Sequence, residues 1–134
     1  STALPPGVLA AAGAAIELAS GEEGARRRGR LADLCGVFRA GLEEMGFEMP
    51  GRSGDAEVPI FPIIVGEAKD ALALADHMLD AGVFLLAIRP PTVPEGTCRL
   101  RATLTATHTA AQIGHVLDAL ESGIKKLGIG PQKV

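Results

Sequence analysis

The sequence predicts an α+β domain with a small, three-stranded, mainly antiparallel sheet and helices packed on one face. The first observation is that apolar residues recur at spacings of three and four in three segments, which is the period of an amphipathic helix. The second is that three apolar or β-branched runs lie between those segments, at residues 58–66, 83–88 and 98–105. An alanine-rich segment comes first, so the expected order is α-α-β-α-β-β-α, and 134 residues suit one domain.

The first expected helix is GVLAAAGAAIELAS, residues 7–20, which follows Pro5-Pro6. Proline suits the first turn of a helix, where its missing N–H would have no partner. One face of this helix is almost entirely Ala and Gly. Such a face allows close approach to another surface but fills little volume, and the chain offers it no obvious partner. We therefore expect this helix to stand apart.

The second helix is expected to open at a capping box formed by Ser20 and Glu23 and to end at Gly46. Residues 26–30, RRRGR, are expected to be a solvated helix face rather than a nucleic-acid site. The apolar stripe of this helix consists of Leu31, Leu34, Cys35, Phe38, Leu42 and Met45.

Residues 50–57 have loop chemistry, and the run VPIFPIIVG at 58–66 contains two prolines. Because proline cannot donate a ladder hydrogen bond, this run predicts an edge strand or an interrupted one. Residues 67–80 are expected to form the third helix, which stops at Gly82. Its inward residues are expected to be Ala71, Leu72, Ala75, Met78 and Leu79.

The next two strands differ in pattern. VFLLAI, residues 83–88, shows no alternation and is expected to be buried on both faces. CRLRATLT, residues 98–105, alternates. One face of this strand carries Cys98, Leu100, Ala102 and Leu104, and the other carries Arg99, Arg101, Thr103 and Thr105.

The last helix is expected to open at a capping box formed by Thr109 and Gln112. Lys125 and Lys126 suit its C-terminal dipole, and Gly128 is expected to end it. Its apolar stripe consists of Ile113, Val116, Leu117, Leu120, Ile124 and Leu127.

Charge and composition argue against a nucleic-acid-binding, membrane-spanning or zinc-binding protein. The net charge is −3 with interspersed signs, which argues against nucleic acid or anionic lipid as a partner. No apolar run approaches the ~18–20 residues of a membrane span, and no signal peptide pattern is present. Cys35 and Cys98 lack zinc-ligand spacing, so we expect two buried thiols, no metal and a cytoplasmic location. The chain opens at Ser1 in mid-motif, and we expect it to be part of a longer protein.

The residues offer little catalytic chemistry. No phosphate-cradling glycine loop is present. His77 and His115 lie off the apolar stripes and are expected to be exposed, whereas His108, beside a helix start, suits capping or packing. No catalytic residue is therefore expected within these 134 residues.

The segment at residues 89–92 has a pattern that the packing of the fold does not explain. Arg89 follows an apolar strand directly, and Pro90-Pro91 and Thr92 come next. A residue before proline is forced into extended geometry, and the prolines fix φ at two successive positions. A guanidinium held in this way suits a carboxylate, which it can grip with two parallel hydrogen bonds, and the Thr92 hydroxyl could add a donor. The alternative is a surface arginine that caps a strand and pairs with a nearby Glu.

The segment AIRPPTVPEGTCRLRATLTATHT, residues 87–109, closely resembles the C-terminal region of the 8-amino-7-oxononanoate synthase family. STALPP at residues 1–6 resembles a second motif of that family, and the resemblance spans the chain. These proteins are α-oxoamine synthases, pyridoxal-phosphate (PLP) enzymes of fold-type I, the aspartate aminotransferase fold. The fold implied is the C-terminal small domain of such an enzyme.

The resemblance implies roles for four residues. The residues that match Arg89 and Thr92 bind the amino-acid substrate, with the arginine on its carboxylate. Those that match Ser1 and Thr2 reach across a homodimer interface to the cofactor phosphate of the other subunit. The reaction implied is decarboxylative condensation of L-alanine with pimeloyl-CoA, or the acyl-carrier-protein thioester, in biotin biosynthesis.

The resemblance also implies what the chain lacks. In such enzymes the lysine that binds PLP lies upstream, in a large domain. Lys69, Lys125, Lys126 and Lys133 have nothing around them to lower an amine pKa. We therefore expect residues 1–20 to be an interdomain segment with a linking helix and residues 21–134 to be the small domain. The chain alone is expected to be inactive and without PLP.

Two alternatives remain. The chain could belong to another α-oxoamine synthase, of the glycine C-acetyltransferase, 5-aminolevulinate synthase or serine palmitoyltransferase type. It could instead be a non-catalytic regulatory module that binds an amino acid through Arg89.

Overall fold

The computed structural model describes residues 3–49 and 58–131. The observed order of elements is the predicted one. The elements are α1 (Pro6–Ser20), α2 (Glu22–Glu44), β1 (Ile60–Gly66), α3 (Ala68–Asp80), β2 (Leu86–Ile88), β3 (Cys98–Thr103) and α4 (Ala110–Leu127). The predicted loop at residues 50–57 lies outside the described residues.

The three strands form an antiparallel sheet in the order β1-β3-β2. On β3, Arg101 lies opposite Pro62 of β1 and Leu86 of β2. β1 is an edge strand with an irregularity between Ile64 and Gly66, so the prediction from its two prolines is confirmed. The antiparallel α+β architecture is confirmed as well.

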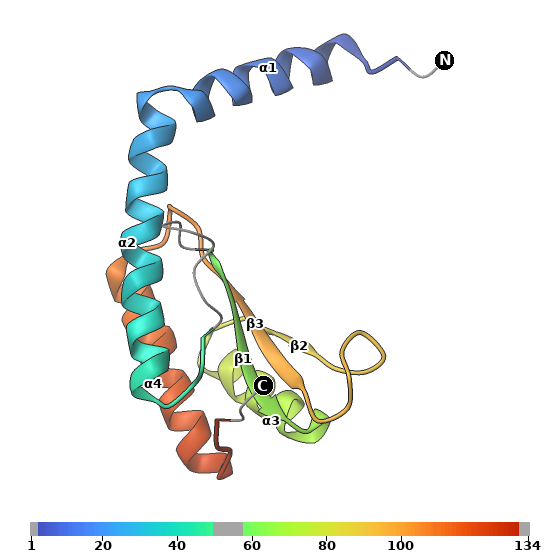
Figure 1. Ribbon diagram of the computed structural model, residues 1–134, viewed down its shortest axis with the longest axis vertical. Coiled ribbons are helices and arrows are strands. Elements are labelled where there is room, and N and C mark those ends of the chain that lie inside the picture. The colour runs from blue at the N-terminus through green and yellow to red at the C-terminus, as the bar shows by residue number, and fades with distance from the viewer. Residues whose placement is uncertain (1–2, 50–57, 132–134) are drawn as a thin grey trace.

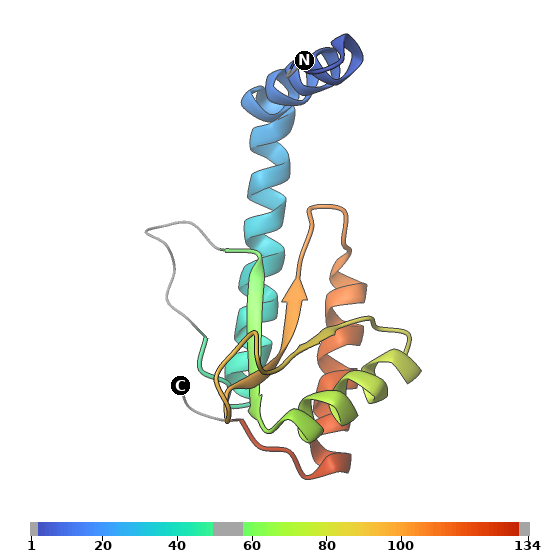
Figure 2. The ribbon, with the colours of Figure 1, turned by 90° about the vertical axis from the view of Figure 1, so that its right-hand side faces the viewer.

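The helices α2 and α4 stack behind one face of this sheet, and α3 packs against the strands and α4 (Figures 1 and 2). The other face of the sheet has no described helix over it. The enclosed core includes an edge-to-face pair, Phe38 on α2 and Phe61 on β1, whose ring centroids lie 5.1 Å apart. The alternation of β3 is confirmed, because Cys98, Leu100 and Ala102 are buried.

The prediction that residues 83–88 form a strand buried on both faces is wrong. β2 has only three residues and lies at the other edge of the sheet, so one of its faces meets solvent. Phe84 and Leu86 are exposed, whereas Val83 is buried and Leu85 packs against the core. An apolar run shows no alternation when apolar residues occupy the open face too, and this is why the pattern misled.

The start of α2 also differs from the prediction. Ser20 is the last residue of α1, and Gly21 is the N-cap of α2 with no side-chain cap, so the Ser20–Glu23 capping box is wrong. Glu23 instead pairs with Arg26 and Arg27. The hydrogen bond from Arg27 is the main reason that the pKa of the Glu23 carboxyl lies below its usual value. The arginine run is exposed, as expected.

The inward faces of the other helices are partly as predicted. The capping box of Thr109 and Gln112 is confirmed, and Gly128 ends α4 with φ of 65°. Three leucines assigned inward, Leu72, Leu79 and Leu127, are exposed instead. In α3 the buried positions are Ala71, Leu74 and Met78. The helical spacing admitted two neighbouring stripes, and Leu74 rather than Leu72 lies on the buried one.

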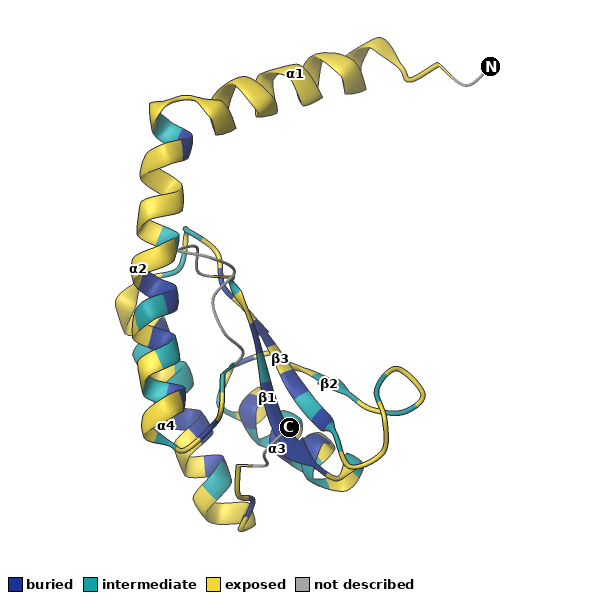
Figure 3. Cartoon of the chain, in the orientation of Figure 1, coloured by how far each residue is buried: buried dark blue, intermediate teal, exposed yellow. Residues whose placement is uncertain are grey.

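The helix α1 stands away from the rest of the described chain (Figures 1 and 3). None of its residues is buried, and its apolar side chains Val8, Leu9, Ile16 and Leu18 are exposed. Its end is fixed to α2 by the Arg28 guanidinium, which donates to the Ala19 carbonyl oxygen at 2.6 Å. The expectation that this helix lacks a partner is met among the described residues.

Cys35 and Cys98 are free and buried. Among the described helices, none combines the length and the hydropathy that crossing a bilayer requires.

Candidate functional site

Arg89 lies where β2 gives way to a tight turn. Ile88, the last residue of the strand, pairs with Arg99 of β3. The backbone N–H of Thr92 donates to the carbonyl oxygen of Arg89 at 3.1 Å, which closes a turn over Pro90 and Pro91. Because proline fixes φ, this turn holds the Arg89 backbone with little freedom.

The rest of the loop is held by its own hydrogen bonds. Both the backbone N–H and the hydroxyl of Thr97 donate to the Pro94 carbonyl oxygen, at 3.2 and 2.8 Å. The Arg99 Nε then donates to the Thr97 carbonyl oxygen at 2.9 Å. Gly96 has φ of 75°, a conformation that L side chains rarely adopt. The loop that carries Arg89 and Thr92 is thus preorganised.

The side chains of Arg89 and Thr92 are exposed. Neither has a side-chain hydrogen bond or ion pair with another described residue. The alternative in which Arg89 pairs with a nearby Glu therefore has no counterpart in the described part of the chain. An unpaired guanidinium on a stiff loop can bind an external carboxylate without first breaking an internal pair.

A second arginine, Arg101, has its side chain on the face of the sheet that no described helix covers. It is exposed on β3, beside Pro62 and Leu86, and forms no side-chain ion pair within residues 3–49 and 58–131. Arg101 pairs with Leu86, the first residue of β2, and Arg89 directly follows the last residue of the same strand. The alternating RLR pattern placed Arg101 on this face, but nothing in the pattern distinguished it from an ordinary solvated arginine.

The other residues considered from the sequence are the N-terminal hydroxyl pair and the lysines. Ser1 and Thr2 lie outside the described residues. Lys69 and Lys126 are exposed on helices, and Lys125 pairs with Glu121 at 2.6 Å. Within residues 3–49 and 58–131, all three lysines are exposed on helices, and none lies in the Arg89 turn.

The histidines have structural contacts. The Thr105 backbone N–H donates to His108 Nδ1 at 3.1 Å, in keeping with a capping or packing role. The Nε2 of His115, which is exposed as predicted, lies 2.9 Å from the Ala81 carbonyl oxygen. His77 is half-buried rather than exposed, because its ring lies against Gly123 on α4.

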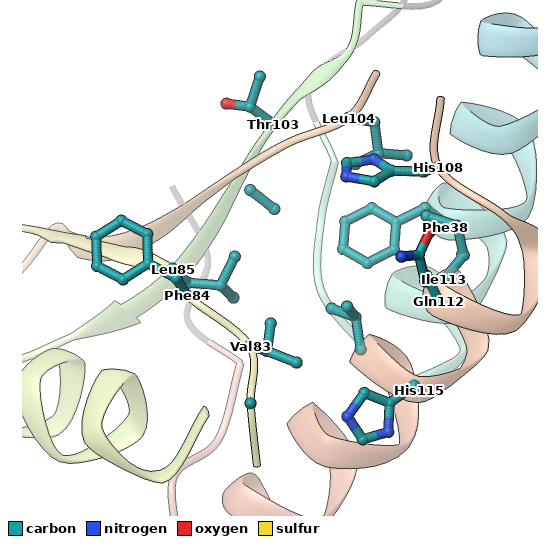
Figure 4. Close-up of a pocket in the computed structure, with 13 residues that line it drawn as sticks. Phe38, Val83, Phe84, Leu85, Thr103, Leu104, His108, Gln112, Ile113 and His115 are labelled. Carbon is teal, nitrogen blue, oxygen red and sulfur yellow. The ribbon is translucent and has the colours of Figure 1, made fainter. Parts of the chain in front are cut away.

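A cavity of about 270 Å³ lies at the other end of β2 (Figure 4). Its walls come from the segment 82–85, the end of β3 and the first turns of α4. The sequence did not predict this cavity, because its walls come from segments far apart in the chain. The residues that line it are Phe38, Gly82, Val83, Phe84, Leu85, Ala102, Thr103, Leu104, His108, Gln112, Ile113, His115 and Val116.

The sequence and the fold match those of a known class of proteins. The family model described as aminotransferase class I and II matches residues 1–120, and the chain belongs to this family. Among its curated relatives are 8-amino-7-oxononanoate synthases. The protein of that name from Geobacter sulfurreducens is 46% identical over 129 residues, which are 96% of this chain and 32% of the relative. The one from Cupriavidus necator is 44% identical over 92% of this chain and 31% of the relative. The chain thus spans about a third of the length of these relatives.

Solved structures give the same result. A serine palmitoyltransferase from S. paucimobilis with a bound PLP–myriocin aldimine has a TM-score of 0.81 and 30% identity, over 96% of this chain and 31% of that one. An 8-amino-7-oxononanoate synthase from Francisella tularensis has a TM-score of 0.73 and 26% identity, over 96% of this chain and 36% of that one. The resemblance to fold-type I PLP enzymes predicted from the sequence is confirmed.

Proposed function

We propose that this chain is the C-terminal part of a PLP-dependent acyltransferase. The enzyme would condense L-alanine with pimeloyl-CoA, or pimeloyl-acyl carrier protein, with loss of CO₂. The product would be 8-amino-7-oxononanoate, an intermediate of biotin biosynthesis. The observation that carries this proposal is the 46% identity to a synthase of that name over 96% of the chain.

Arg89 would bind the carboxylate of the amino acid. Its fork can donate two parallel hydrogen bonds, which fixes the direction of the substrate as well as its distance. Thr92, three residues along the same turn, would donate from its hydroxyl. The hydrogen bond that closes the turn, from Thr92 N–H to the Arg89 carbonyl oxygen at 3.1 Å, supports this pairing because it keeps the two residues together.

Arg101 is a second candidate for the same carboxylate. The observation in its favour is its exposure on the open sheet face, without a side-chain partner among the described residues. Arg99 is a weaker candidate, because its Nε already donates to the Thr97 carbonyl oxygen. If both arginines bind the carboxylate, neither Arg89→Ala nor Arg101→Ala alone should abolish binding of the amino acid.

The described residues do not by themselves fit PLP, since they bring no lysine and no cluster of phosphate donors to the Arg89 turn. PLP would be held by residues of the large domain, with Ser1 and Thr2 donating to its phosphate across a homodimer, and the cofactor would supply the electron sink for the reaction. Residues 1–20 would form the interdomain segment and residues 21–134 the small domain. The exposed apolar side chains of α1 support this division, because they would pack on the large domain.

Two other functions remain to be tested. Another α-oxoamine synthase activity is favoured by the structural similarity to serine palmitoyltransferase, although that identity is only 30%. An amino-acid-binding regulatory module would use Arg89 without any chemistry. In either case the arginine turn keeps its role, so substrate choice separates the three.

The test is an assay of the full-length protein with L-alanine, glycine and L-serine, each against pimeloyl-, acetyl-, succinyl- and palmitoyl-CoA. Turnover with L-alanine and the pimeloyl thioester alone is expected. Preference for glycine or serine would move the protein to another branch of the family. Absence of turnover with every pair, while alanine still binds, would favour the module.

Arg89→Ala in that protein is expected to weaken binding of the amino acid by about 2–5 kcal/mol. Arg89→Lys should recover only part of this, because an ammonium cannot make the bidentate fork. Arg101→Ala is the companion variant, and Arg26→Ala, which removes only an exposed ion pair on α2, is the control. Alanine dependence like that of the parent protein in both Arg89→Ala and Arg101→Ala would contradict the carboxylate role.

The 134-residue chain alone is expected to form no covalent PLP adduct. After incubation with PLP and borohydride reduction, intact mass spectrometry should show only scattered labelling of exposed lysines. One stoichiometric adduct on a single lysine would show that a PLP-binding lysine lies within this chain.

A further inference from the structure

We propose that the cavity of Figure 4 binds a small aliphatic carboxylate at a site separate from the Arg89 turn. Segment 82–85 precedes β2 and lines the cavity, whereas Arg89 follows β2, so the two sites lie at opposite ends of the strand. Small-molecule sites are concave, mostly apolar and carry a few convergent polar groups, with volumes of ~300–1,000 Å³. At about 270 Å³ this cavity lies just below that range and suits a small ligand.

The walls of the cavity are apolar. Phe38, Leu104 and Ile113 are buried side chains that form part of it, and Val83 closes another side. Phe84, which also lines the cavity, is 78% exposed. An apolar wall with an exposed aromatic ring beside it fits the aliphatic body of a ligand, since burying that body removes apolar surface from water.

His108 supplies one hydrogen-bond donor. The Thr105 backbone N–H can only donate, so His108 Nδ1, 3.1 Å away, must accept. In the neutral ring the proton is therefore on Nε2, which none of the described residues accepts from. Figure 4 places this ring at the same end of the cavity as the Gln112 side chain.

Gln112 supplies the second donor. Its Oε1 accepts from the Thr109 backbone N–H at 2.9 Å, as part of the capping box of α4. This bond fixes which end of the amide is oxygen, and the remaining –NH₂ group is a donor. The amide nitrogen in Figure 4 is directed toward the cavity. Two donors from separate residues thus converge at one end.

The charge of the lining favours an anion. No Asp or Glu is among the described residues that line the cavity. The Arg30 guanidinium donates to the His108 carbonyl oxygen at 3.0 Å, which brings a positive charge beside the donor end. Two donors, a nearby cation and no acid fit a carboxylate head group better than an ammonium or a neutral alcohol.

The experiment is a titration of the full-length protein with hexanoate, followed by saturation-transfer NMR, in the parent protein and in Gln112→Glu. Glutamate at this position keeps the capping-box acceptor and is favoured in the first turn of a helix, so the fold should survive. It replaces the donor by a negative charge. Hexanoate is expected to bind on the order of tenfold to a hundredfold more weakly to this variant.

Hexylamine is the matched probe, with the same body and the opposite charge. It should bind the parent protein more weakly than hexanoate and should gain affinity in Gln112→Glu. Val116→Phe, which fills the cavity from α4, should remove the signals of both probes. If that variant unfolds, the negative charge introduced by Gln112→Glu still decides the question.

Arg89→Ala separates this site from the one in the proposed function. Hexanoate should bind this variant with an affinity within about twofold of the parent value, whatever happens to amino-acid turnover. The proposal is overturned if hexanoate does not bind the full-length protein, if Gln112→Glu binds it as well as the parent does, or if Arg89→Ala abolishes binding.

Discussion

The helices α1 and α4 have similar lengths, 15 and 18 residues, but very different surroundings. α4 buries four residues, begins at a complete capping box and ends at a left-handed glycine. α1 buries none, has no side-chain cap, and is exposed along its whole length (Figure 3). Both segments were predicted as helices. The sequence features that favour a helix therefore differ from those that pack it against the rest of the domain.

The difference has a physical reason. An isolated helix of this length is marginal in water, and most helical stability in proteins comes from packing an apolar stripe. α4 has such a stripe, which includes Ile113 and Leu120. The apolar residues of α1, such as Val8 and Ile16, are separated by Ala and Gly and find no described surface. This lack of a packing surface supports the proposal that α1 packs on a large domain.

The largest expected effect comes from a charge placed in each helix. Leu120 on α4 is fully buried, and Leu120→Asp would bury a carboxylate without a partner. We expect a loss of more than ~4 kcal/mol, enough to unfold the domain. Ile16→Asp on α1, at a residue 66% exposed, should change stability by less than ~0.5 kcal/mol.

Circular dichroism during urea denaturation is the measurement, because the chain has no Trp or Tyr. Equal losses at the two positions would mean that α1 is seated on the body of the domain after all. In the full-length protein Ile16→Asp should become destabilising, since α1 is proposed to pack there on the large domain.

The next largest effect on stability is expected at the corner between α1 and α2. A Cβ on Gly24 would lie 2.1 Å from the Ala19 carbonyl oxygen, so Gly24→Ala must move α1 relative to α2. A Cβ on Gly29 in the same helix would meet nothing within 4 Å. Gly29→Ala should therefore stabilise α2 by up to ~1 kcal/mol, while Gly24→Ala should cost ~1–3 kcal/mol or redirect α1.

The direction of α1 can be followed by electron-spin distance measurements between labels at Ala14→Cys and Glu44→Cys, both exposed positions. Cys35 and Cys98 are buried and should label slowly. Gly24→Ala should shift or broaden the distance distribution, and Gly29→Ala should leave it unchanged. A distribution unchanged in Gly24→Ala would show that the corner does not depend on this glycine.

Where the sequence carried two consistent signals, it predicted the fold well. β3 was placed in register because its alternation and its buried face agree, with Leu100 inward and Arg101 outward. α4 was placed because its cap and its stripe agree. A single signal was less reliable: the apolar run at 83–88 did not reveal that Phe84 and Leu86 face solvent.

The candidate site was predictable only in part. The stiffness of the Arg89 turn follows from two prolines, which act locally. Arg101 lies beside β2, the strand that leads to Arg89, through its pairing with Leu86, and no local pattern shows this contact between residues 15 positions apart. The cavity depends on four parts of the chain meeting, Phe38 of α2 included, and its donor set depends on which atoms of His108 and Gln112 already form hydrogen bonds. Such assignments need coordinates.

The smallest expected effect concerns the helix starts. The Gln112 backbone N–H donates to the Thr109 Oγ1 at 3.2 Å, so Thr109→Ala removes the cap of α4 and should cost ~1 kcal/mol, while Thr109→Ser should cost little. Pro5 is the N-cap of α1 and offers no side-chain acceptor. Pro5→Ser should thus raise the helicity of α1 without moving the urea midpoint of the domain, because α1 shares no buried residue with it. A midpoint that rises with Pro5→Ser as much as it falls with Thr109→Ala would mean that the two helices belong to one cooperative unit, contrary to the separation of α1 described above.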